Sequence, residues 1–262
     1  MAQGRERRLD EAALRIPEAS QIGLASHDSM SSVTTRRLAA ILDVDGTLVD
    51  SNYHHALAWY RAFREHDIVV PLWRLHRHVG MGGEKYVAAV AGDVVERELG
   101  NELRACWERL FDRLLPEIEP LDGAYELMAQ LKDLGHPIVL ASSAIESHFD
   151  AFVDDKLDAR ELADAWTTKD DVEASKPDPD LVRAALSKAR TSNAIMIGDT
   201  PWDCEAASRA GISTICVLTG GYSESELREA GTAAVFDSPR TLLEQLDETP
   251  FATPAVSRID DD

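Results

Sequence analysis

The sequence has few cysteines and no long apolar run, and each of these absences excludes a class of protein. Its 262 residues contain only three cysteines, Cys106, Cys204 and Cys216, with no CxxC spacing. An odd and widely spaced set predicts neither a disulfide framework nor a zinc site. No apolar run approaches membrane-spanning length, and the first residues lack the apolar segment of a secretory signal. We therefore expect a cytoplasmic protein without a membrane partner.

Positive charge is scarce relative to negative charge. The chain has 27 Lys and Arg residues against 47 Asp and Glu residues, which gives a formal net charge of −20. A surface of this kind repels nucleic acids and anionic membranes, so the sequence predicts neither as a partner. An anionic substrate would therefore need local positive charge. Whether the chain is a monomer or a homodimer stays open.

Short apolar runs alternate with amphipathic segments over most of the chain. The runs predict strands at residues 38–42, 137–141, 194–198, 213–218 and 233–236. The segments between them have helical spacing, as in Ala124, Leu127, Leu131 and Leu134. This alternation predicts an α/β fold, a Rossmann-like parallel-sheet core with crossover helices.

One long stretch between the first two predicted strands breaks the alternation. Its apolar stripes have helical spacing, as in Leu99, Leu103 and Trp107, and they predict an inserted helical cap domain at residues 52–119. The hinges of such a cap would lie beside the end of the first strand. A small domain hinged over a polar site can close and exclude water.

The remaining chain is assigned from these boundaries. The core domain would consist of residues 38–51 and 120–248. Residues 1–37 mix charged and hydroxyl side chains without a sustained period, and we expect a mobile N-terminal extension there. Residues 249–262 carry two prolines and an acidic end, which is typical of a tail.

The first predicted strand leads into two aspartates, Asp43 and Asp45, followed by Gly46. Residues two apart in a strand share one face, so these like charges would repel each other. A shared proton or a bound divalent cation would offset the repulsion, which suggests chemistry. The spacing alone fits equally well a loop in which one carboxylate caps the turn at Gly46.

More polar residues follow the later strands or precede a helix. They are Ser142, Ser143, Lys176, Asp199 and Asp203. Singly, each has a structural explanation as a helix cap, a turn former or a surface charge. Together, at the carboxyl ends of parallel strands, they form a set suited to phosphoryl transfer. The aspartates, with Asp43, would hold Mg²⁺, and the serines and the lysine would bind phosphate oxygens.

These residues resemble the haloacid dehalogenase superfamily of aspartate-nucleophile phosphatases. The resemblance rests on "DVDGT" at 43–47, Ser142, Lys176 and "GDTPWD" at 198–203, in this order. It implies that Asp43 is the nucleophile and that Asp45 is the general acid and base. It also implies that the Asp45 carbonyl binds Mg²⁺ and that Thr47 positions the phosphate. The insertion resembles the cap of the phosphoglycolate phosphatase and β-phosphoglucomutase subgroup.

We therefore expect a Mg²⁺-dependent phosphatase that hydrolyses a small phosphate monoester, of the phosphoglycolate or sugar-phosphate type, through an aspartyl-phosphate. The alternative is a β-phosphoglucomutase-like phosphomutase. Asp45 argues against a dehalogenase, which lacks this aspartate, while Gly198 and Gly83 stand where the mutase has a glutamate and an arginine. A receiver domain uses similar groups but carries its acceptor on a middle strand. A catalytically idle binding protein is a further alternative, which a phosphatase assay would separate.

Substrate selection is expected from the cap. The loop "GMGGEK" contains Gly82, Gly83, Glu84 and Lys85, and its glycines permit close backbone approach. Glu84 and Lys85 would then reach polar groups of the leaving alcohol, although a plain turn between helices fits the pattern nearly as well. His55 is a further candidate for this role, and a histidine at the surface of a helix fits the sequence equally well. His76, in the preceding segment, is expected at the solvated surface.

Overall fold

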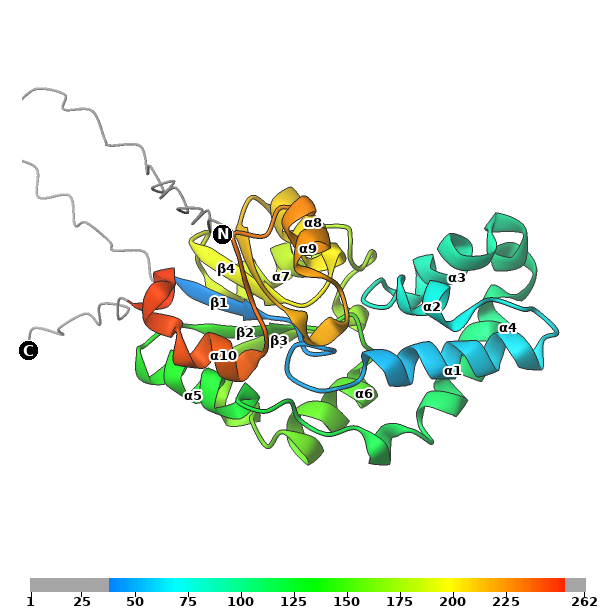
Figure 1. Cartoon of the computed structure of the whole chain (residues 1–262), viewed down its shortest axis with the longest axis horizontal. Coiled ribbons are helices and arrows are strands. Elements are labelled where there is room, and N and C mark those ends of the chain that lie inside the picture. The colour runs from blue at the N-terminus through cyan, green and yellow to red at the C-terminus, as the bar shows by residue number, and fades with distance from the viewer. Residues whose placement is uncertain (1–37, 253–262) are drawn as a thin grey trace, which may run out of the picture. The chain divides into compact units, whose positions relative to one another are not determined.

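The computed structural model describes residues 38–252, and their centre is a parallel sheet covered by helices on both faces (Figure 1). The six strands are β1 (Ala39–Leu42), β2 (Ile138–Ala141), β3 (Ala165–Thr167), β4 (Ala194–Gly198), β5 (Ser213–Val217) and β6 (Ala234–Phe236). Their order is β3-β2-β1-β4-β5-β6, and all pairs are parallel. The α/β class predicted from the sequence is confirmed. The predicted extension at 1–37 and residues 253–262 of the predicted tail lie outside the described residues.

Successive side chains along a strand point to opposite faces of the sheet. Ala40 and Leu42 of β1 belong to one apolar cluster, whereas Ala39 and Ile41 belong to another. The first cluster includes side chains of α5 (Ala124–Asp133) and α10 (Pro239–Glu244). The second includes α7 (Asp180–Ala189) and α8 (Pro201–Ala210). Burial on both faces explains why these strands are short, continuous apolar runs.

Strand β3 is the one element of the sheet that the apolar runs did not predict. It contains three residues, and two of them are only half-buried. It pairs with β2 at one edge of the sheet, through Val139 opposite Ala165. A short edge strand carries little apolar signal, so its pattern merges with the surrounding loop.

Four α-helices lie between β1 and α5, and we call them the cap. They are α1 (Asn52–Glu65), α2 (Leu72–His76), α3 (Gly83–Ala91) and α4 (Asp93–Phe111). Helices α1, α3 and α4 bury apolar side chains against one another, among them Phe63, Tyr86, Leu103 and Phe111. All four helices lie inside the predicted range 52–119, although the domain boundaries themselves stay predictions. None of the helices in residues 38–252 combines the length and apolarity that a membrane crossing requires.

The segment that leads into the cap and the segment that leads out of it lie side by side. Val49 forms an isolated antiparallel bridge with Pro120, and Asp50 donates its backbone N–H to the Glu119 carbonyl at 3.0 Å. Both connections therefore meet just beyond the carboxyl end of β1. This arrangement brings the first residues of the cap next to the residues that follow the strand.

The remaining helices connect strands of the core. Helices α6 (Glu146–Asp150) and α9 (Glu224–Glu229) follow β2 and β5. Helix α8 begins after β4 with a capping box, in which Thr200 and Asp203 satisfy each other's backbone N–H groups, and with Pro201 in its first turn. These caps define where the chain turns from strand to helix, at the edge of the sheet where the polar residues gather.

Candidate active site

Three buried carboxylates gather at the carboxyl ends of β1 and β4. Asp43 follows β1, Asp199 follows β4, and Asp203 lies in the first turn of α8. Each offers an oxygen, and these oxygens lie within 4.8 Å of one another. The backbone N–H of Asp43 continues the sheet ladder to the Ile197 carbonyl at 2.9 Å. The two central strands therefore position the first two carboxylates.

The capping box at the N-terminus of α8 fixes the third carboxylate, that of Asp203. Asp203 Oδ2 accepts hydrogen bonds from Thr200 N at 3.0 Å and from Thr200 Oγ1 at 2.7 Å. Its other oxygen, Oδ1, lies 2.7 Å from Lys176 Nζ and forms an ion pair with it. A side chain at Gly198 would meet Asp203 Cβ at 2.6 Å, so glycine allows this close approach. The difference from the mutase pattern at 198 therefore has a steric basis here.

One ammonium group faces this cluster. Lys176 is fully buried and makes ion pairs with Asp43 and Asp203. Burial lowers the pKa of Lys176, but the two carboxylates outweigh burial and hold it above its ordinary value. Burial also raises the pKa of Asp43 to about 7, although Lys176 opposes this change. Burial and Asp203 together raise the pKa of Asp199.

Asp45 has different partners from Asp43. Its Oδ1 accepts hydrogen bonds from Ser51 Oγ at 2.6 Å and from His55 Nε2 at 2.7 Å. The His55 ring stacks on Phe111 of α4, with 4.0 Å between the ring centroids. Burial raises the pKa of Asp45, but His55 and Ser51 outweigh it, so the pKa lies below its ordinary value. The carboxylate form, which a general base requires, is therefore favoured.

Two further side chains bind Asp199. Thr47 Oγ1 donates to Asp199 Oδ1 at 2.7 Å, and Asn52 Nδ2 donates to Asp199 Oδ2 at 2.7 Å. Thr47, which the family resemblance assigns to the phosphate, thus contacts a carboxylate of the cluster in this structure. Asn52, the first residue of α1, was not expected from the sequence. Its position at the start of the first cap helix, five residues after Thr47, is the signal that could have identified it.

The cluster suits a hard divalent cation. Its donors are carboxylate oxygens, which Mg²⁺ prefers. The single ammonium of Lys176 does not balance the three carboxylates of the cluster. Asp43, Asp199 and Asp203 could therefore hold a metal ion in the position predicted from the sequence.

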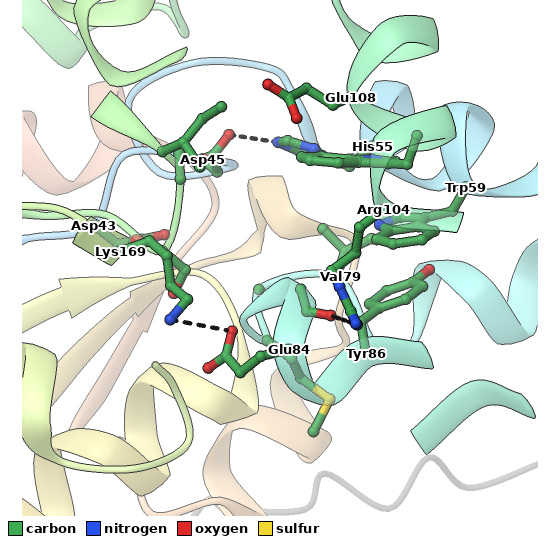
Figure 2. Close-up of a pocket in the computed structure, with 17 residues that line it drawn as sticks. Asp43, Asp45, His55, Trp59, Val79, Glu84, Tyr86, Arg104, Glu108 and Lys169 are labelled. Atoms are coloured by element: carbon green, nitrogen blue, oxygen red, sulfur yellow. Dashed lines mark hydrogen bonds and ion pairs between the residues drawn. The ribbon is translucent and has the colours of Figure 1, made fainter. Parts of the chain in front are cut away.

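A cavity of about 370 Å³ opens above Asp43 and Asp45 (Figure 2). Its wall combines core residues, among them Ser143 and Lys169, with residues of α1, α3 and α4 and of the segment that precedes α3. Ser143 Oγ is buried and has no hydrogen-bond partner within residues 38–252, whereas Ser142 Oγ lies 3.3 Å from Asp45 Oδ2. Ser142 thus contacts Asp45, and Ser143 belongs to the wall of the same cavity as the two aspartates.

The predicted selection loop is divided between the cavity and the core. Gly83 and Glu84 line the cavity, whereas Gly82 and Lys85 do not. Glu84 Oε1 accepts the backbone N–H of Ser175 at 2.9 Å, and Lys85 Nζ donates to the Ser175 carbonyl. The loop therefore holds the residue that precedes Lys176.

His76 is not at the solvated surface, so that expectation was wrong. Its side chain is buried, and Nε2 donates to the Gly220 carbonyl at 3.0 Å. The ring stacks on Tyr53 with centroids 4.4 Å apart. Sequence spacing could not reveal the burial of His76, because its partner Gly220, in the turn after β5, is distant in the chain.

Comparison with known proteins decides the family. The family model of haloacid dehalogenase-like hydrolases matches residues 38–211. The chain belongs to this family. A phosphatase of validoxylamine A 7'-phosphate from Streptomyces hygroscopicus subsp. limoneus is 34% identical over 198 residues, covering 73% of this chain and 90% of that one. The family resemblance seen in the motifs is thereby confirmed.

Two further relatives agree with this assignment. A phosphoglycolate phosphatase from Rhodospirillum rubrum is 30% identical over 238 residues, covering 84% of this chain and 97% of that one. The crystal structure of a hydrolase from Pseudomonas syringae matches with a TM-score of 0.77 and 33% identity, covering 81% of this chain and 99% of that one. The haloacid dehalogenase-like chain is therefore a phosphatase that acts on phosphoric monoesters.

Proposed function

We propose that this protein hydrolyses a small phosphorylated metabolite in a Mg²⁺-dependent reaction that passes through an aspartyl-phosphate on Asp43. The observation that carries the proposal is the buried cluster of Asp43, Asp199 and Asp203 around Lys176, directly below a cavity. Such a cluster can stabilise a phosphate dianion only if the negative charge of its own carboxylates is offset. The carboxylate oxygens can bind a divalent cation, which would supply the positive charge.

Asp43, Asp199 and Asp203 would hold the Mg²⁺ ion, together with the Asp45 carbonyl that the family resemblance implies. The bound ion would reduce the repulsion between the nucleophile and the phosphate dianion. Thr47 and Asn52 orient the Asp199 carboxylate through their hydrogen bonds. They therefore act as positioning residues.

The chemical steps are assigned to the two aspartates. An oxygen of Asp43 forms a bond to phosphorus while the ester P–O bond breaks. Asp45 must enter this step protonated; it gives its proton to the leaving alkoxide and becomes the carboxylate that His55 and Ser51 stabilise. Asp45 then takes a proton from water, whose oxygen attacks phosphorus and releases inorganic phosphate from Asp43. Ser142, Ser143 and Lys176 would bind the phosphoryl oxygens during both steps.

The relatives support a small phosphorylated metabolite as the substrate, because two of them are named for validoxylamine A 7'-phosphate and for phosphoglycolate. The mutase alternative requires binding of a second phosphate. Arg104, the cation on the cap side of the cavity, makes two hydrogen bonds to Glu96, at 2.8 and 2.9 Å. Because this guanidinium already has a carboxylate partner, hydrolysis is favoured over phosphoryl transfer to a sugar.

The test is phosphate release from a panel of phosphate monoesters, with Mg²⁺ and with EDTA. We expect Mg²⁺-dependent turnover of p-nitrophenyl phosphate and of at least one metabolite. Turnover that persists in EDTA would contradict the metal assignment. With β-glucose 1-phosphate and a trace of the bisphosphate, glucose 6-phosphate formed faster than free phosphate would support the mutase instead.

A further inference from the structure

The cavity is large enough for a ring and larger than a two-carbon acid requires. Its volume of about 370 Å³ corresponds to roughly a dozen water-sized groups at about 30 Å³ each. A six-membered ring with its substituents has about as many non-hydrogen atoms. The reacting aspartates lie at one end of this space, so the remaining volume is available to the leaving alcohol.

One wall of the cavity consists of stacked aromatic rings from three cap helices. Tyr86 of α3 stacks on Trp59 of α1, and Trp59 stacks on Trp107 of α4, with centroid distances of 4.5 and 5.2 Å. The Tyr86 hydroxyl donates to the Leu75 carbonyl at 2.7 Å, so this polar atom is already engaged. The Trp107 indole N–H is covered by other protein atoms and has no hydrogen-bond partner within residues 38–252, so the ring presents no accessible polar atom to the cavity. The wall therefore offers carbon surface, which suits the C–H face of a polyol ring.

The cations of the cavity, Arg104 and Lys169, both have a carboxylate of the protein nearby. Arg104 is bound to Glu96 and also donates to the Gly83 carbonyl at 3.2 Å. Lys169 lies 3.7 Å from Glu84 Oε2 (Figure 2). A carboxylate or a second phosphate on the leaving group would have to compete with these protein carboxylates. That competition disfavours anionic leaving groups.

Glu108 of α4 is different, because it is an exposed residue at the cavity whose carboxylate has no hydrogen bond or ion pair within residues 38–252 and is therefore free to meet a ligand. Figure 2 shows it on the same side of the cavity as His55 and Asp45, with Glu84 and Lys169 on the other. A carboxylate in this position accepts hydrogen bonds from hydroxyl or ammonium groups and repels carboxylates.

We propose that the leaving group is a polyol ring without negative charge, and that Glu108 selects for it. This inference rests on the proposed phosphatase function and specifies its substrate class. The ring lies against the aromatic wall of Tyr86, Trp59 and Trp107, and its hydroxyl or amino groups donate to Glu108. Phosphorylated carboxylic acids and bisphosphates are rejected by the same side chain.

The test compares kcat/KM for α-glucose 1-phosphate, α-glucosamine 1-phosphate and α-glucuronic acid 1-phosphate, which share one ring and differ in charge. Phosphoglycolate is the fourth substrate, and p-nitrophenyl phosphate reports the chemistry alone. We expect the neutral and amino sugars to exceed the glucuronate and phosphoglycolate by at least about 10-fold, the effect of one hydrogen bond to a charged group. Glu108→Gln should reduce this ratio and Glu108→Lys should reverse it.

Glu102→Gln is the matched control, because Glu102 lies on the same helix with a side chain 70% exposed and outside the cavity. This control should keep the wild-type ratio. The proposal is overturned if phosphoglycolate or the glucuronate is preferred. It is also overturned if no ring phosphate reacts while p-nitrophenyl phosphate does, or if Glu108→Lys leaves the ratio unchanged. Failure to hydrolyse p-nitrophenyl phosphate as well would instead contradict the phosphatase function itself.

Discussion

The ammonium nitrogen of Lys176 lies 2.7 Å from Asp203 Oδ1 and also pairs with Asp43. All three side chains are buried, so each depends on the others for charge compensation. Lys176→Met would leave the carboxylates without this cation. We expect it to lower the free energy of unfolding in EDTA by about 3–5 kcal/mol.

Urea denaturation at neutral pH measures this loss, and added Mg²⁺ should restore part of it. Lys156→Met is the control, since Lys156 is a surface residue whose Nζ contacts only the Pro116 carbonyl, at 3.2 Å. A loss for Lys176→Met no larger than that of the control would show that the ammonium does not compensate the cluster.

The pKa changes in the cluster predict how Mg²⁺ binding depends on pH. Burial raises the pKa of Asp43 to about 7, from 3.8, and burial raises that of Asp199. In the absence of metal, the folded protein therefore retains protons that the unfolded chain has released. The stability from this protonation is complete below the ordinary carboxyl pKa and is lost as the pH rises through 7.

Mg²⁺ binds ionised carboxylates and so competes with these protons. We expect Mg²⁺ to raise the melting temperature more at pH 8 than at pH 6, with apparent affinity on the order of 10-fold weaker at pH 6. Thermal unfolding at several Mg²⁺ concentrations measures both values. Asp199→Asn should reduce the effect at both pH values. An equal or larger rise at pH 6 would contradict the assigned ligands.

The role of Asp45 can be separated from that of Asp43 by the choice of leaving group. Asp45→Asn removes the proton donor, and with an alkyl phosphate we expect kcat/KM to fall by about 10² to 10⁴. The loss should be smaller with p-nitrophenyl phosphate, because nitrophenolate departs without a proton. If both substrates lose activity equally, Asp45 does not act as the acid.

The contact between the cap loop and the core predicts an effect on turnover far from the substrate. Lys85 Nζ pairs with Asp178 Oδ2 at 2.6 Å and binds the Ser175 carbonyl, next to Lys176. Lys85→Met should shift this segment and lower kcat by roughly 10-fold, because small displacements of catalytic groups are costly. Steady-state kinetics with p-nitrophenyl phosphate would measure it. The control is Lys132→Met, which removes a lysine at the surface of the core domain whose Nζ donates to the Glu161 carbonyl. It should not change kcat.

Much of the core could be predicted from the sequence because its determinants are local. Strand β1 is a continuous apolar run buried on both faces, and the aspartates that follow it are part of a compact motif. Strand β3 escaped prediction because it is short and half-buried at an edge. The polar residues placed at strand ends, Asp43 and Asp199, share one edge because the sheet is parallel.

The cavity could not be predicted in the same way, because cap and core residues form it together. Glu108 and Arg104 are ordinary charged residues of a surface helix in the sequence, and only the packing of α4 brings them to the cavity wall. Asn52 and His76 likewise acquire their roles from partners more than a hundred residues away, namely Asp199 and Gly220. No local pattern encodes such contacts.

The central claim is that Asp43 is the nucleophile, and its most direct test is phosphate release from p-nitrophenyl phosphate by Asp43→Asn in saturating Mg²⁺. An amide is a poor nucleophile, and this substrate removes any dependence on leaving-group protonation. With its melting temperature measured alongside to establish folding, the variant should show no turnover above the uncatalysed rate. Turnover by the folded variant within about 10-fold of the wild type would contradict the account, because one side chain that forms the covalent intermediate cannot be dispensable.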